Sequence, residues 1–73
     1  MGGALLFSAS GSLELFRDAL IEHWQNAGLE PVIRDQNQQS TIIEVTTETQ
    51  IVRAFLVQVS AQRVDITVIQ IAP

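Results

Sequence analysis

The side chains best suited to catalysis in this sequence are a single histidine and the acids near it. His23 is the only imidazole, and Glu22 and Trp24 flank it. A general acid or base needs a hydrogen-bonding partner and a cleft, whereas adjacent residues of a helix point roughly 100° apart. We therefore interpret His23 as a surface residue. An enzymatic role would require an acidic residue from a second subunit.

Three serines around a glycine form the best candidate for a binding site. Ser8, Ser10 and Ser12 surround Gly11, immediately before a predicted helix. Hydroxyls and free backbone N–H groups at a helix N-terminus can hold a carboxylate or a phosphate. We therefore expect these residues to cap the helix, and the alternative is that Ser10, Gly11 and Ser12 bind a small anionic ligand. No base can be placed beside these serines, so we expect no nucleophilic catalysis.

A row of acids on the predicted helix could offer oxygen ligands to a metal. Glu14, Asp18 and Glu22 recur every four residues and share one helical face. Successive turns of one helix rarely surround a cation, and the chain has no cysteine to supply thiolate ligands. We expect a solvated acidic face, no metal site and no cofactor.

The charge balance argues against nucleic acid as a partner. The formal net charge is −4, and arginines 17, 34, 53 and 63 are scattered along the chain, whereas nucleic-acid binding needs clustered cations. No apolar run approaches the ~20 residues that cross a bilayer, and residues 1–8 lack the basic start of a signal peptide. We expect a soluble, cytoplasmic protein that binds neither nucleic acid nor membranes.

The chain is short for the apolar surface it carries. At 73 residues it is expected to form one domain, residues 1–73, and such a domain buries only about 60% of the unfolded chain's surface. Hydrophobic residues nonetheless make up 47% of the sequence. We expect another chain to cover part of this surface, in a homodimer, a higher homo-oligomer or a complex with a partner protein.

Hydrophobic spacing and turn residues predict most of the secondary structure. They indicate a helix over residues 12–27 and strands over residues 4–8, 32–34, 41–46 and 64–71. Residues 4–8 carry no charge, which favours a central strand. Ser12 is a good N-cap, and Gly28 stands where a C-terminal cap is expected.

Residues 48–60 fit two different elements. Ile51, Phe55, Leu56 and Val59 follow helical spacing, and Thr47 with Gln50 three residues later matches a capping box. The β-branched residues of the same segment favour a strand that turns at residues 61–62 and pairs with residues 64–71. A helix is our first expectation, and a hairpin is the alternative.

The expected fold is an α+β ferredoxin-like βαββαβ sandwich, with a four-stranded antiparallel sheet and two helices on one face. The alternative order is βαββββ, with residues 50–71 as a β-hairpin. Because the strands are apolar on both sides, the sheet face without helices should form a dimer interface. The residues expected in this interface are Leu6, Ile33, Ile42, Ile69 and Ile71.

Two segments carry a resemblance to known proteins. A strand enters a Gly-containing turn over residues 6–13 (LFSASGSL), and a helix ends in an Ala-Gly step over residues 26–29 (NAGL). Both resemble small ferredoxin-like regulatory domains of the ACT type, which implies association through sheets and helices and amino-acid binding near the turn at Gly11. Residues 53–56 (RAFL) and 64–66 (VDI) also look like the C-terminal accessory domain of some ABC-transporter ATPases.

The function expected from these observations is association rather than catalysis. The first hypothesis is a small non-catalytic regulatory or protein-interaction module that homo-oligomerises through its sheet face. The second is a sensor of a small ligand, an amino acid or anion, bound at the turn formed by Ser10, Gly11 and Ser12. The third is a small dimeric ferredoxin-like enzyme that uses His23.

Overall fold

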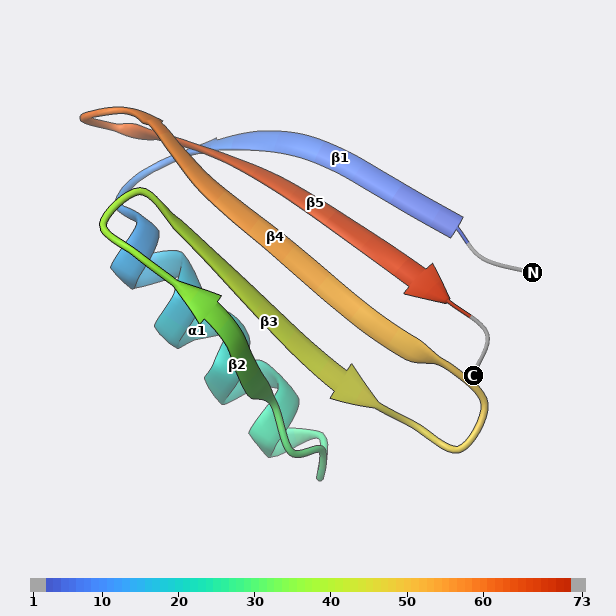
Figure 1. Cartoon of the computed structure of the whole chain (residues 1–73). Coiled ribbons are helices and arrows are strands. Elements are labelled where there is room, and N and C mark those ends of the chain that lie inside the picture. Colours follow the sequence, from blue (N-terminus) through green and yellow to red (C-terminus); the bar gives the residue numbers. More distant parts are fainter. Residues whose placement is uncertain (1–2, 72–73) are drawn as a thin grey trace.

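The computed structural model describes residues 3–71 as one helix packed on a single sheet (Figure 1). The elements are β1 (Gly3–Ser10), α1 (Leu13–Asn26), β2 (Val32–Gln36), β3 (Ser40–Thr46), β4 (Ile51–Ser60) and β5 (Arg63–Ile71). The five strands pair antiparallel in the order β1-β5-β4-β3-β2. Because α1 packs mainly against β3 and β4, it covers only part of one sheet face.

The expected ferredoxin-like order βαββαβ is wrong. Where a second helix was expected, the chain forms β4, so the described residues build a five-stranded sheet with one helix instead of a four-stranded sheet with two. β4 pairs with β5 across the turn at Ala61 and Gln62, as the hairpin alternative has it. The element order of the described chain is therefore βαββββ.

β4 carries apolar residues on both faces, which explains why their spacing predicted a helix. Ala54 and Leu56 are buried on the α1 side, whereas Phe55 and Val57 alternate with them on the other face. A segment that is apolar on both faces satisfies a helical period and a strand period together. β-Branched residues such as Val57 and Val59 then favour the strand, because their side chains are stiff in a helix.

Thr47 and Gln50, which were expected to cap a second helix, instead close the turn between β3 and β4. The Thr47 hydroxyl accepts a hydrogen bond from the Gln50 N–H at 3.1 Å. The Thr47 N–H donates to the Gln50 carbonyl at 2.8 Å. Threonine side chains stabilise turns by the same local hydrogen bonds that cap helices, so this pair of residues fits either structure.

The helix expected over residues 12–27 is confirmed as α1. Ser12 is its N-cap, and the Ser12 hydroxyl accepts the Leu15 N–H at 3.2 Å. Gly28 follows the helix with φ +83°, a left-handed conformation that glycine adopts without strain. Within residues 3–71, no helix has the length and apolar character needed to cross a membrane.

The core lies between α1 and the middle of the sheet. Its buried side chains are Leu13, Ile43, Ala54, Leu56, Val64 and Ile66. Leu5 and Phe7 of β1 pair with Val68 and Ile66, so they project to the same side as this core. They are nevertheless 60% and 43% exposed, because α1 does not extend over β1.

β1 lies at an edge of the sheet, so the expectation of a central strand is wrong. Within the described chain its one strand neighbour is β5, and β2 forms the opposite edge (Figure 1). Residues 3–10 have the uncharged composition of a strand paired on both sides. β1 therefore has the composition of a central strand but lies at an edge of the sheet.

Candidate functional site

The sheet face opposite α1, which we call the open face, carries apolar side chains from all five strands. One row across β1, β4 and β3 contains Leu6, Phe55 and Ile42, joined by Thr67 of β5. Leu6 is 72% exposed, and Val57 in the next row is 42% exposed. Further apolar side chains of this face are Val32, Ile51, Ile69 and Ile71. The open face thus presents apolar side chains that no other described element covers.

Five residues were expected in a dimer interface on one sheet face. The strand register places four of them on the open face and one on the α1 side. Leu6, Ile42, Ile69 and Ile71 project from the open face. Ile33 pairs with the buried Ile43, so it lies on the α1 side. The register of β2 shifts between Ile33 and Asp35, which a simple two-residue alternation does not anticipate.

An ion pair lies in the middle of the open face. Glu44 and Arg53 are directly opposite on β3 and β4, and both Nε and Nη2 of Arg53 donate to Glu44 Oε1, at 3.0 and 2.6 Å. Arg34 approaches the second carboxylate oxygen of Glu44 at 3.8 Å. The hydrogen bonds from Arg53, aided by the charge of Arg34, hold the pKa of Glu44 below its ordinary value.

The lowered pKa of Glu44 predicts a pH-dependent contribution to stability. The carboxylate is favoured in the folded state, so its contribution is complete above the ordinary pKa of 4.5 and is lost as the pH falls through the lower folded pKa. We expect Glu44→Gln to reduce the free energy of unfolding near neutral pH. The difference from wild type should vanish in acid. Denaturant unfolding of both proteins from neutral to acidic pH measures this difference in stability. A difference that stays constant into acid would show that it does not come from the Glu44 carboxylate.

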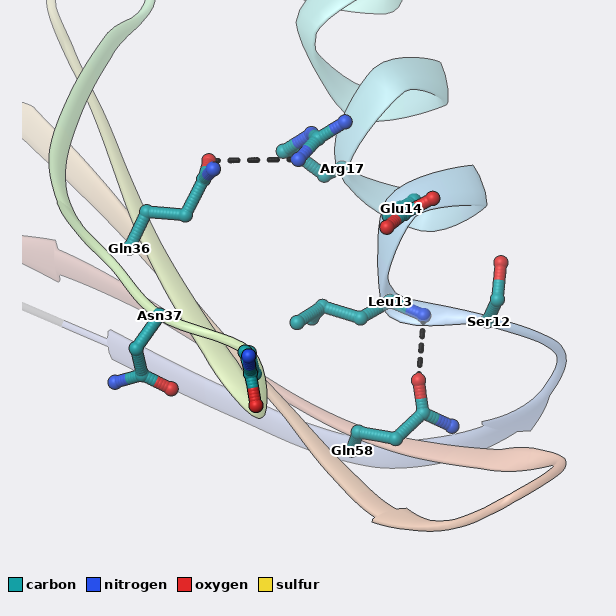
Figure 2. Close-up of a pocket in the computed structure, with 8 residues that line it drawn as sticks. Ser12, Leu13, Glu14, Arg17, Gln36, Asn37 and Gln58 are labelled. Atoms are coloured by element: carbon teal, nitrogen blue, oxygen red, sulfur yellow. Dashed lines mark hydrogen bonds between the residues drawn. The ribbon is translucent and has the colours of Figure 1, made fainter.

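A polar pocket of about 500 Å³ lies at the N-terminus of α1 (Figure 2). Figure 2 shows Arg17 reaching across the pocket toward Gln36, with a hydrogen bond of 3.4 Å. The remaining labelled lining residues are Ser12, Leu13, Glu14, Asn37 and Gln58. Arg17 also donates to Asp18 at 2.9 Å, which raises the pKa of its guanidinium, so Arg17 remains charged.

Gln58 of β4 occupies the position at the helix N-terminus that an anion would take. Its Oε1 accepts the Leu13 N–H at 2.6 Å (Figure 2). Its Nε2 donates to the carbonyl oxygens of Gly11, Ser60 and Arg63 at 3.2, 2.6 and 3.1 Å. The side chain therefore joins the turn before α1 to the β4–β5 hairpin and satisfies a backbone donor that a bound ligand would need.

The three residues expected to bind a ligand do not converge on one space. Ser12 lines the polar pocket, whereas Ser10 lines a separate hollow with Ser8 and Arg63. The Gly11 N–H donates to the Gln62 carbonyl at 2.8 Å. Gln58, which organises this region, was missed, because a glutamine in a strand has no sequence signal for capping a helix 45 residues away. The ligand site at Ser10, Gly11 and Ser12 stays a prediction.

His23 borders an apolar groove between α1 and the sheet. This groove of about 290 Å³ is lined by Phe7, Phe16, Ala19, Leu20, His23, Leu56, Ile66 and Val68. All its other lining side chains are hydrocarbon, so the groove offers His23 no acidic partner from within residues 3–71. Its shape and chemistry suit packing against apolar groups.

The described residues therefore present two kinds of site: apolar surfaces and a polar pocket that Gln58 partly occupies. Across residues 3–71 no three acidic or histidine side chains come together in a way that could hold a metal ion. The uncovered surfaces lie on the open face and along β1. No protein-family model matches the chain, and neither a curated protein nor a solved structure gives a match.

Proposed function

We propose that the protein is a non-catalytic interaction module that assembles with copies of itself through the open face. The observation that carries the proposal is the set of apolar side chains on this face, from the exposed Leu6 to the half-buried Phe55 and Ile42. Contiguous exposed apolar surface on a small protein is typical of a protein–protein interface. Burying one exposed leucine or isoleucine gains about 1.5 to 3 kcal/mol, and a two-fold contact gains this twice.

The dimensions of the sheet support this proposal. The molecule measures 37 × 24 × 18 Å, so one sheet face is comparable with the ~800 Å² per partner of a standard protein interface. The Glu44 and Arg53 charges already pair within the chain, at 2.6 Å. A second copy that covers them therefore need not supply a counter-charge, although it must desolvate the pair.

A lysine at Val57 tests the open-face contact without disturbing the core. Val57 is 42% exposed and stands opposite Asp65, so the lysine of Val57→Lys gains an acidic cross-strand neighbour in the folded chain. We expect the variant to fold, as measured by circular dichroism. Its mass in sedimentation equilibrium should be lower than that of wild type at the same concentration, because the interface would have to bury an ammonium group.

The control for this experiment is Leu15→Lys, which adds the same charge elsewhere. Leu15 is 62% exposed on α1, away from the open face, and the substitution should leave the mass unchanged. If Val57→Lys keeps the mass of wild type while both variants remain folded, the open face is not the interface.

A further inference from the structure

The two edges of the sheet differ in how well they are protected from pairing with another strand. β2 begins just after Pro31, has five residues, carries Arg34 and Asp35, and contains a register irregularity. β1 has eight residues, no charge and no proline, and its register with β5 is unbroken. Charges, proline, bulges and short length are the features that stop edge strands from associating. These features protect the β2 edge from pairing with another strand, and the β1 edge lacks them.

The exposed side chains of β1 increase its tendency to pair. Leu5 and Phe7 are exposed on the α1 side, and Leu6 is exposed on the open face. Alternate residues of an edge strand also direct their N–H and C=O groups outward, where another strand can bond them. We infer that β1 pairs antiparallel with β1 of a second copy, so that the two sheets become one continuous sheet.

Two-fold symmetry restricts the register of this pairing. Directly opposite residues of antiparallel strands share a sheet face, so a residue on the open face must oppose another open-face residue. In a symmetric pair one residue therefore lies opposite its own copy, and residues at equal distances on either side of it pair with each other. Leu5, Leu6 and Phe7, the exposed large apolar residues of β1, are the candidates for this central position.

The side-chain sizes of β1 favour Leu6 as the central residue. Leu5 then pairs with Phe7 of the second copy, Ala4 with Ser8, and Gly3 with Ala9. Large apolar residues meet large ones, and small residues meet small ones. With Phe7 at the centre, Leu6 would instead oppose Ser8, and Leu5 would oppose Ala9. With Leu5 at the centre, Leu6 would oppose Ala4, and Phe7 would oppose Gly3. This size symmetry about Leu6 makes the strand complementary to itself, which is why a second copy is the partner we infer.

Pairing about Leu6 also creates an apolar cluster on the α1 side. It brings Leu5 and Phe7 of both copies together, next to the groove where Phe7 meets Phe16 and Val68. The interface uses the edge of the sheet rather than its face. It goes beyond the proposed open-face contact and does not depend on it. A protein with both contacts would form assemblies larger than a dimer.

Single cysteines test the register, because the natural chain has none. Opposite Cα atoms in an antiparallel pair lie about 4.5 to 5.5 Å apart, within the range that a disulfide spans. We expect Leu6→Cys to form a disulfide-linked dimer with oxidised glutathione. Ser8→Cys alone should not, because its own copy would lie roughly 13 Å away along the strand. A mixture of Ala4→Cys and Ser8→Cys should give the mixed dimer.

Leu15→Cys is the control for random collision, because Leu15 is also exposed but lies on the helix. If Leu6→Cys cross-links no faster than Leu15→Cys, the edge pairing is wrong. If Ser8→Cys alone cross-links as fast as Leu6→Cys, the register is wrong. Adding Val57→Lys to the Leu6→Cys protein separates the β1 contact from the open-face contact. If the double variant with Leu6→Cys and Val57→Lys still cross-links, the result supports pairing through β1. This holds whether or not Val57→Lys alone lowers the mass.

A charge exchange provides a test that needs no oxidation. In the inferred register, Leu6→Lys places two like charges directly opposite each other, and so does Leu6→Glu. Each variant alone should lose the edge contact, whereas an equimolar mixture should regain it as a mixed dimer in native mass spectrometry. Leu6 is 72% exposed, so neither substitution removes a core side chain. No preference for the mixed dimer would overturn the pairing of Leu6 with its own copy.

Discussion

Replacing Gln58 with alanine should lower the free energy of unfolding by about 2 to 3 kcal/mol. The amide accepts the Leu13 N–H at 2.6 Å, and its two N–H donors are shared among three carbonyl oxygens, of which that of Ser60 is nearest at 2.6 Å. Alanine leaves the partly buried Leu13 N–H without this acceptor and releases the turn before α1 from the β4–β5 hairpin. Because a core of this size supplies only about 3 to 5 kcal/mol, much of the protein should unfold at moderate temperature.

Two further variants show whether the amide itself is responsible. Gln36→Ala removes an exposed glutamine whose side chain only accepts one long hydrogen bond from Arg17, at 3.4 Å, and should change stability by less than about 0.5 kcal/mol. Gln58→Glu keeps an acceptor for Leu13 but loses the donors to Gly11 and Ser60. It should therefore remain destabilised. Thermal unfolding of all three variants measures this, and a Gln58→Ala protein as stable as wild type would show that the hydrogen bonds of Gln58 do not stabilise the fold.

Leu56→Ala should cost about 2 to 5 kcal/mol and leave little folded protein. Leu56 is buried beneath α1, where it pairs across the sheet with Thr41 and Ile66. Truncation removes apolar contacts on both sides and leaves a cavity that a two-layer structure closes poorly. Denaturant unfolding followed by far-UV circular dichroism measures the loss.

The matched control for the core is Leu15→Ala, the same change at a residue that is 62% exposed. It should leave stability within about 0.5 kcal/mol of wild type. Equal effects of the Leu56 and Leu15 substitutions would contradict the burial of Leu56 beneath α1.

The local elements could be predicted wherever a single pattern dominated. Ser12 and Gly28 marked the two ends of α1, and the strand positions near residues 32, 41 and 64 were close to those observed. β4 was not predictable in the same way, because Phe55 and Leu56 are both apolar although they face opposite sides of the sheet. What distinguishes strand from helix there is pairing with β3 and β5, and those contacts are remote in sequence.

The candidate surfaces were predictable only in part for a similar reason. Two-residue alternation placed Leu6, Ile42 and Ile69 on one face, and the structure agrees. Ile33 differs because the β2 irregularity changes which residues share a side. The order of strands, which puts β1 at an edge, depends on the whole sheet. So does the position of Gln58 beside Leu13, a hydrogen bond that joins segments 45 residues apart.

Sedimentation equilibrium of the wild-type protein, from micromolar to millimolar concentration, measures whether the protein associates with itself. The chain has a mass of 8.0 kDa, and we expect a dimer or a larger assembly whose population rises with concentration. The mass should fall when Val57→Lys is introduced and remain unchanged with Leu15→Lys. A folded wild-type protein that stays at 8.0 kDa over the whole range would show that neither the open face nor β1 joins copies of the chain.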